Sequence, residues 1–263
     1  SSHLGLCPRR ACAGSSSPST DNPYLLHASF PPNLSGLAGM AALSCLTVAA
    51  VMLAHVAAVR DAIGCGCFWH MQHSFAEEER AALHREGSGV TSRAAYAGGT
   101  RVGQRGRVCY HNAGNVDDYN ALGHAEVVAM SVPRADFGVF ADSYWKLCPG
   151  GARQDEQDLG GEYRSVIGLP GGMSSPLLER LQKGAGRTQL VPGAGNEGDT
   201  LGQGKVYVYD STKFPAHIAE KYHQFHDDMI EKYPDAYHEL RQFAERTACP
   251  GDGADIRGGF MNS

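Results

Sequence analysis

The sequence is poor in charge and has no run of basic residues. Charged residues make up 19% of the 263 residues and the formal net charge is −5, whereas soluble domains usually carry roughly 25% charged residues. Proteins that hold nucleic acid by neutralising its phosphates need clustered Lys and Arg. We therefore expect no nucleic-acid partner. Around Gly98 and Gly99 there is also no G-x-G-x-x-G or Walker pattern, which argues against a phosphate cradle at that pair.

The cysteines show no repeating spacing. An even number of them could form a disulfide framework, but a chain of this length can bury a core without such cross-links. We therefore expect thiol chemistry rather than a disulfide scaffold. The eight cysteines stand at positions 7, 12, 45, 65, 67, 109, 148 and 249.

Residues 1–55 have the composition of a targeting segment. Residues 1–33 are rich in Ser and Pro, and an uncharged apolar stretch covers 34–59. About 20 apolar residues can span a bilayer, but the many Ala, Gly and Ser residues suit the core of a signal peptide equally well. A signal or transit peptide, a membrane anchor and a spurious extension before Met40 remain open. A targeting signal would place the protein in an organelle or the secretory pathway, and without one it would be cytoplasmic.

Apolar residues at helical spacing predict three helices in the remaining chain. The first begins at Cys67, and the second begins at Pro215, because proline favours the first helical position. Pro234 ends the second helix, and a third follows it. Their apolar stripes are Phe68, Met71 and Phe75; Ile218, Tyr222, Phe225 and Met229; and Tyr237, Leu240 and Phe243.

Short β-rich runs at 92–96, 126–132, 164–169 and 205–210 predict strands, whereas the Gly-rich stretch 184–204 reads as a surface loop. The helices and strands do not alternate regularly. This pattern favours an α+β fold, a two-layer sandwich in which the Cys67 helix packs on a small mixed sheet. We expect the folded domain to cover residues 56–247 and the Gly-rich residues 248–263 to form a mobile tail.

Cys67 is the strongest candidate for a reactive group. A thiol in the first turn of a helix lies near unsatisfied N–H groups, which should lower its pKa. Phe68 and Trp69 beside it offer an aromatic wall for a methyl group or a soft sulfur. A nucleophile beside an aromatic pocket is a catalytic pattern, although a buried structural cysteine among core aromatics would have the same composition.

Five blocks of the sequence, in order, resemble the A-type peptide methionine sulfoxide reductases. Each block is weak alone, but their order makes the resemblance specific over roughly residues 60–232. The blocks are Gly66-Cys67-Phe68-Trp69, Tyr96-Ala97-Gly98-Gly99, Gly123-His124-Ala125-Glu126-Val127-Val128, Asp158-Leu159-Gly160-Gly161-Glu162-Tyr163-Arg164-Ser165 and Tyr222-His223-Gln224.

The resemblance implies a ferredoxin-like core and a thiol-dependent reduction of the S-epimer of methionine sulfoxide, a repair reaction of oxidative stress. Cys67 would be the nucleophile, and Glu126 would be the buried acid that protonates the sulfoxide oxygen. Tyr96 and Tyr163 would donate hydrogen bonds to that oxygen, with Asp158 orienting them through water. Phe68 and Trp69 would hold the methyl group. No cofactor is implied, and the protein would act as a monomer on free or peptide-bound sulfoxide.

The sulfenic acid left on Cys67 needs a second thiol and then a dithiol reductant such as thioredoxin. Cys249 is the first candidate because family members often carry resolving cysteines in a Gly-rich tail. Cys65 is the second, although a Cys-x-Cys disulfide closes a small strained ring. Cys109, Cys148 and direct reduction of the sulfenic acid remain open.

The sequence departs from the family around the nucleophile. His70-Met71-Gln72 replaces the usual Gly-x-Glu, Glu162 replaces a Gln, and the stretches 96–126 and 184–204 are longer than usual. A non-catalytic paralogue that binds oxidised methionine is therefore an alternative. A metal site is another, because Cys65, Cys67, His70 and His73 are four zinc-competent ligands within nine residues.

Overall fold

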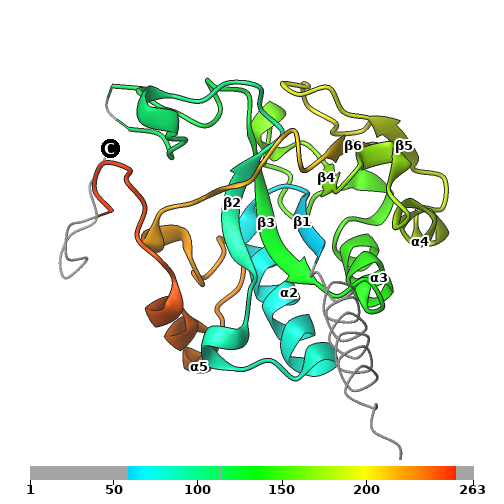
Figure 1. The fold of residues 1–263 in the computed structure, drawn as a ribbon, viewed down its shortest axis with the longest axis horizontal. Helices are drawn as coiled ribbons and strands as arrows, with labels where there is room; N and C mark the ends of the chain where they lie inside the picture. Colours follow the sequence, from blue (N-terminus) through cyan, green and yellow to red (C-terminus); the bar gives the residue numbers. More distant parts are fainter. Residues whose placement is uncertain (1–58, 113, 253–263) are drawn as a thin grey trace, which may run out of the picture. The chain divides into compact units, whose positions relative to one another are not determined.

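The computed structural model describes residues 59–112 and 114–252 (Figure 1). The expected targeting segment, residues 1–55, lies outside the described residues, as do residues 253–263 of the expected tail. Within the described ranges, none of the helices combines the length and the apolar character needed to cross a membrane.

A mixed seven-stranded sheet organises the domain (Figure 1). The strands follow the order β5-β6-β4-β1-β3-β2-β7. The neighbouring pairs β4-β1, β1-β3, β3-β2 and β2-β7 are antiparallel, whereas the pairs β4-β6 and β6-β5 are parallel. The bounds are β1 Val59–Gly64, β2 Arg93–Ala97, β3 Ala125–Val132, β4 Val166–Leu169, β5 Gln189–Pro192, β6 Lys205–Asp210 and β7 His217–Ile218.

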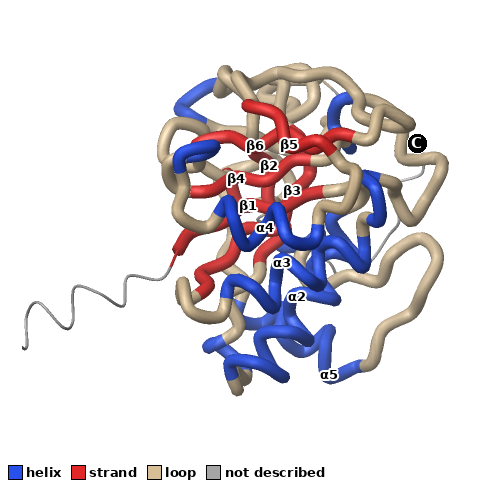
Figure 2. Tube along the Cα trace, turned by 90° about the vertical axis from the view of Figure 1, so that its right-hand side faces the viewer, coloured by secondary structure: helices blue, strands red, loops and turns tan. Residues whose placement is uncertain are grey.

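Helices lie on one side of the sheet, and loops cover much of the other side (Figure 2). The α-helices are α2 Phe68–Leu83, α3 Phe137–Leu147, α4 Leu178–Gly184 and α5 Asp235–His238. The 3₁₀ turns in the described ranges are Gly87–Gly89, Gln104–Gly106, Pro149–Gly151, Gly161–Tyr163, Gly172–Ser174, Lys221–His223 and Glu239–Phe243.

Alternation along β3 divides the core between the two faces of the sheet. Val128 and Met130 join the large cluster under α2 and α3, whereas Ala125 and Val127 join a smaller cluster on the opposite face. Because successive side chains of a strand point to opposite faces, Glu126 shares the helix-covered face with Val128. The strand therefore directs this carboxyl group toward the start of α2.

The predicted Cys67 helix is confirmed by α2, and the four predicted strands correspond to β2, β3, β4 and β6. The mixed α+β character is confirmed as well. The strand β1 and the helices α3 and α4 were not predicted from the sequence. The stretch 184–204, expected as a loop, contains β5, which pairs in parallel with β6.

The helix expected from Pro215 is absent from this part of the described chain, and the prediction is wrong. The segment instead forms the short strand β7, which pairs with β2, and one 3₁₀ turn. The buried amide of Gln224 binds both the N–H and the C=O of Ala94, and Phe225 has a φ of +52°. Sheet-edge hydrogen bonds thus replace helical ones. The expected stripe is split, since Phe225 is buried but Met229 is 79% exposed.

Two disulfides correct the expectation that the cysteines act mainly as thiols. Cys65 bonds to Cys148 and Cys109 bonds to Cys249, with Cα separations of 6.2 and 5.7 Å. They join residues 83 and 140 positions apart, so local spacing carried no sign of the pairing. Among the cysteines of the described residues, Cys67 alone is free.

Candidate active site

Cys67 occupies the N-cap of α2, directly after the strand β1 and a tight glycine turn. Gly66 has a φ of +77°, and a Cβ at this position would lie 2.7 Å from the carboxylate of Asp158. Only glycine combines that backbone conformation with such a close approach. The turn therefore places the thiol at the N-terminal end of the helix and brings Asp158 against it.

The thiol opens into a cavity of about 200 Å³. Its wall combines aromatic rings, carboxyl groups and an apolar segment, residues 229 and 230, from the irregular chain between β7 and α5. The lining residues are Cys67, Phe68, Trp69, His70, Tyr110, Glu126, Gln154, Asp155, Asp158, Tyr163, Asp228, Met229 and Ile230. Of the sequence-predicted site residues, the structure thus brings together Cys67, Phe68, Trp69, Glu126, Asp158 and Tyr163.

Two carboxyl groups accept hydrogen bonds from the N–H groups at the start of α2. The N–H of Cys67 donates to Asp158 Oδ2 at 2.7 Å, and the N–H of Phe68 donates to Glu126 Oε2 at 3.0 Å. Helix N-termini favour such acceptors because these N–H groups have no partner within the helix. The two bonds fix both carboxyl groups beside the thiol.

Glu126 is a buried acid that is mainly protonated at neutral pH. Its side chain is 2% exposed, and the hydroxyl of Tyr119 donates to Oε1 at 3.1 Å. Burial raises the pKa of Glu126 to about 8, although the hydrogen bonds from Phe68 and Tyr119 oppose the rise. A carboxylic acid with this pKa can donate a proton near neutral pH.

The pKa of the Cys67 thiol is raised, so the expected lowering is wrong. Burial is the main cause, and the negative charge of Glu126 adds to it; a hydrogen bond from the backbone of Trp69 acts in the opposite direction. The helix donors that were expected to stabilise the thiolate are in large part taken by Asp158 and Glu126. Because the charge on Glu126 raises the thiol pKa, a protonated Glu126 makes the thiolate easier to form.

The tyrosines are arranged differently from the sequence expectation. Tyr163 lines the cavity, but Tyr96 is fully buried away from it and donates its hydroxyl to Glu220 Oε2 at 2.8 Å. Tyr110 lines the cavity instead, and Tyr119 stacks on Tyr96 and binds Glu126. Tyr110 and Tyr119 both lie in the long stretch between the second and third sequence blocks, where no motif marked them.

Aromatic rings form one wall of the site. Trp69 stacks on His226 with ring centroids 4.4 Å apart, and the buried ring of His223 lies 5.4 Å from Phe68 and 4.4 Å from Tyr110. Burial lowers the pKa of His223 to about 3, so this ring is neutral at physiological pH. The wall is therefore uncharged and suits a methyl group or a thioether.

Gln72, which departs from the family pattern, joins two parts of the fold. Its side-chain amide donates to Gln224 Oε1 at 2.9 Å, and its carbonyl oxygen accepts the N–H of Phe225 at 2.7 Å. Both glutamine side chains are fully buried. Gln72 therefore holds the chain after β7 against α2 and does not line the cavity.

The zinc-ligand set considered from the sequence does not assemble. Cys65 is bonded to Cys148, and His73 stacks on Tyr233 with ring centroids 3.7 Å apart. His70 does line the cavity, where burial lowers its pKa to about 4. Cys67 and His70 alone cannot provide the three or four ligands of a zinc site.

The resolving candidates are also held in disulfides. Cys65 is fully buried against Cys148, and Cys249 is 8% exposed and bonded to Cys109. The N–H of Cys249 donates to the hydroxyl of Thr247 at 3.2 Å. Cys249 is therefore packed against the domain in this structure, in contrast to the free position in the tail that we expected.

The sequence matches no protein-family model and no curated protein. Among the solved structures that are similar to it are one from Corynebacterium diphtheriae and one from Saccharomyces cerevisiae. The chain is similar to methionine sulfoxide reductase A. The protein of that name from Corynebacterium diphtheriae aligns with 18% identity over 64% of this chain and 73% of its own, with a TM-score of 0.39. Mxr1 from Saccharomyces cerevisiae, in its reduced form, aligns with 21% identity over 62% of this chain and 81% of its own, with a TM-score of 0.38.

Proposed function

We propose that this protein reduces the S-epimer of methionine sulfoxide to methionine, using Cys67 as the nucleophile. One observation carries the proposal: a free thiol and a protonated buried acid meet in the same cavity, at the start of α2 and beside an uncharged aromatic wall. Sulfoxide reduction needs these three parts together, since sulfur must be attacked while its oxygen is protonated. The order of the five sequence blocks supports the same reaction.

The reaction transfers one oxygen atom from the substrate to Cys67. The sulfur of Cys67 attacks the sulfoxide sulfur while Glu126 gives its proton to the sulfoxide oxygen. This attack forms an S–S bond, and the proton lost by the thiol restores Glu126. The hydroxyl group then passes to the Cys67 sulfur as the S–S bond and the S–O bond of the substrate break. Methionine leaves reduced by two electrons, and Cys67 remains as a sulfenic acid, oxidised by two electrons.

The other cavity residues have supporting roles in this proposal. Tyr163 and Tyr110 donate hydrogen bonds to the oxygen as it becomes negative, because burial raises both pKa values and keeps these phenols protonated. Asp158 fixes the backbone at Cys67. Phe68 and Trp69 hold the methyl group. The role first expected for Tyr96 passes to Tyr110 because Tyr96 does not line the cavity.

The cavity entrance suits a methionine sulfoxide that belongs to a peptide. Met229 is 79% exposed and Ile230 is 59% exposed, and both belong to the cavity lining. Apolar side chains at the mouth can contact the residues that flank an oxidised methionine. We propose peptide-bound and free sulfoxide as substrates, with the monomer as the active unit.

We also propose a ferredoxin-like core within a catalytic domain of residues 56–247. The central strands follow the order β4-β1-β3-β2, and all of these neighbours are antiparallel. The helix α2 connects β1 to β2, and α3 connects β3 to β4. This split arrangement of two β-α-β halves supports the proposal.

An assay on the full chain tests the reaction. With a thioredoxin system and a racemic mixture of N-acetylmethionine sulfoxide, we expect the S-epimer to be consumed and the R-epimer to remain, because the resemblance to the A-type reductases implies this preference. Chiral chromatography of the remaining sulfoxide measures the outcome. Binding of the sulfoxide without formation of methionine would instead favour the non-catalytic paralogue.

In our proposal, a thiol from the cysteines now held in disulfides regenerates Cys67. We propose that thioredoxin or a similar dithiol first reduces Cys109–Cys249, and that Cys249 then condenses with the sulfenic acid, releasing water and forming a Cys67–Cys249 disulfide. A second dithiol reduces this disulfide and restores both thiols. Tyr110, which follows Cys109, lines the cavity, so this pair lies close along the chain to the site. Cys65 and Cys148 are both fully buried, which leaves them poorly accessible to a reductant.

We predict that Cys249→Ser stops repeated turnover with thioredoxin but still allows one equivalent of methionine to form. The first oxygen transfer needs only Cys67, whereas recycling needs the resolving thiol. Quenched-flow product counting measures the burst and the steady state. Cys148→Ser, which opens the other disulfide, is the matched control and should keep recycling. Unchanged steady-state turnover of Cys249→Ser would show that the reductant attacks the sulfenic acid directly.

A further inference from the structure

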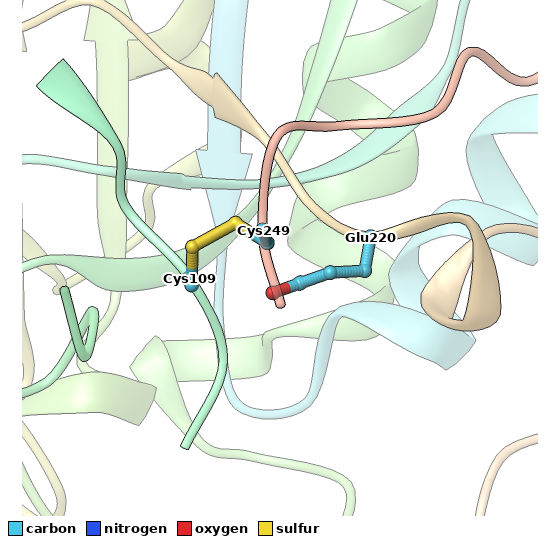
Figure 3. A group of neighbouring side chains, drawn as sticks. All are labelled: Cys109, Glu220 and Cys249. Carbon is cyan, nitrogen blue, oxygen red and sulfur yellow. A yellow bond between two sulfur atoms is a disulfide. The ribbon is translucent and has the colours of Figure 1, made fainter. Parts of the chain in front are cut away.

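A second group of reactive side chains lies outside the cavity lining. Cys109, Cys249 and Glu220 each offer one ligand atom, and these atoms all lie within 4.8 Å of one another (Figure 3). All three residues are buried, with exposures of 1%, 8% and 8%. Three distant parts of the chain supply them, so the fold itself assembles the group.

Hydrogen bonds hold Glu220 in a defined orientation. Tyr96 donates its hydroxyl to Oε2 at 2.8 Å, and the N–H of Tyr110 donates to Oε1 at 2.8 Å. Each carboxylate oxygen keeps a further lone pair free for a cation. In metal sites, ligating carboxylates are commonly fixed in this way by donors behind them, and such donors contribute to affinity.

The chain around Cys249 is fixed next to the same carboxylate. Asp252 Oδ1 accepts the N–H of Lys221 at 2.8 Å, which ties the segment after Cys249 to the residue after Glu220. Asp252 Oδ2 also accepts the N–H of Thr247. These contacts do not depend on the S–S bond, so reduction of the disulfide would leave Cys249 next to Glu220. The hydrogen bond from the N–H of Tyr110 to Glu220 keeps the neighbouring Cys109 beside the same carboxylate.

We propose that the reduced pair Cys109 and Cys249, together with Glu220, binds one Zn²⁺ ion. A dithiol or phosphine reductant supplies two electrons to the S–S bond and is itself oxidised, which yields two thiols. On binding Zn²⁺ each thiol loses its proton to solvent and becomes a thiolate ligand. Two thiolates and one carboxylate are ligands that zinc accepts, and a water completes the tetrahedron as in other sites with three protein ligands.

Metal binding and the disulfide exclude each other, because the sulfur atoms of a disulfide carry no thiolate charge. Zinc would thus hold the pair in its reduced form and keep it from condensing with another sulfur. The site differs from the zinc set considered in the sequence, which used Cys65, Cys67, His70 and His73. None of its three ligands lines the cavity, and Cys249, the thiol proposed above to recycle Cys67, links the site to the sulfoxide chemistry.

Metal titration of the full chain tests this site. The protein is reduced with a phosphine, desalted without oxygen and titrated with Zn²⁺ by calorimetry and with Co²⁺ by absorption. We expect one equivalent to bind to the reduced protein with a thiolate-to-Co²⁺ charge-transfer band, and none to the oxidised protein. Cys109→Ser and Cys249→Ser should each lose this equivalent. Cys148→Ser should keep it, which controls for the opening of a disulfide.

Two further variants test the carboxylate. Glu220→Gln should weaken zinc binding at least tenfold because a charged ligand is lost. Should that variant fail to fold, Tyr96→Phe keeps the carboxylate and removes one donor behind it, with an expected loss of about 10–100-fold. The proposal is overturned if the reduced protein binds no metal, if Cys249→Ser keeps the full equivalent, or if the oxidised protein binds equally well. These metal-binding measurements do not involve sulfoxide, so their outcome does not depend on whether the proposed reaction is correct.

Discussion

Replacing Cys67 with serine should abolish methionine formation, including the first equivalent. A serine hydroxyl is a far weaker nucleophile than a thiol toward sulfur, and it cannot carry the oxygen away as a sulfenic acid. In a serine protease, loss of the catalytic nucleophile lowers kcat by about 10⁶-fold, and we expect a loss of that order here. Single-turnover product counting by chromatography, with enzyme in excess over sulfoxide, measures the loss.

The fold should survive this substitution. Cys67 takes part in no disulfide and sits at the edge of the cavity, so Cys67→Ser removes no cross-link. The matched control is Cys65→Ser, the same change two residues earlier. It breaks the bond to Cys148, and we expect it to cost about 2–4 kcal/mol of unfolding free energy while leaving a single turnover measurable. A Cys67→Ser variant that forms methionine at the wild-type rate would refute the proposed mechanism.

The sequence contained enough information to place Cys67 at the start of a helix and Glu126 on a strand. Cys67 begins a helix whose apolar spacing is regular, and Glu126 lies in a short β-rich run whose alternation points it toward that helix. Both signals are local, because each depends on residues within one turn or one strand. For the same reason α2 and β3 were predicted, whereas the meeting of Cys67 with Glu126 was implied by the resemblance to the A-type reductases.

The features of the site and the fold that could not be predicted depend on contacts between residues far apart in the sequence. Tyr110 and Tyr119 reach the site from a long irregular stretch, and no repeat or spacing connects them with Glu126. The buried amide of Gln224, bound to Ala94 across 130 positions, draws a segment with helical spacing into sheet-edge contacts. The two disulfides likewise join residues that are far apart in sequence, and the pKa of the Cys67 thiol rises because tertiary packing buries it and places Glu126 beside it.

Glu126→Gln should lower the rate of sulfoxide reduction by about 10²–10⁴-fold, the usual range for a lost general acid. The amide is close in shape to the carboxyl group, and its oxygen can still accept the N–H of Phe68, so the fold should be preserved. It has no acidic proton for the sulfoxide oxygen. Rates of single turnover at pH 7 measure the effect, and a rate within threefold of the wild type would remove Glu126 from this role.

The pH dependence of the sulfoxide reduction rate is an independent test of the role of Glu126. Burial raises the pKa of Glu126 to about 8, so the acid form is lost as the pH rises through that value, and the wild-type rate should fall there. Glu126→Gln cannot lose such a proton, so its low rate should show no fall near pH 8.

The thiol itself should report the charge of Glu126. Above pH 8 the wild-type carboxylate is ionised and raises the pKa of Cys67, whereas the neutral amide cannot. Glu126→Gln should therefore lower the thiol pKa, and the rate of alkylation by iodoacetamide should begin to rise at a lower pH than in the wild type. Asp158 remains in place in both proteins, so the shift isolates the charge of Glu126. Glu126→Gln should form the Cys67 thiolate at a lower pH and yet reduce sulfoxide slowly. Measuring both the alkylation rate and the sulfoxide reduction rate therefore separates thiolate formation from proton donation.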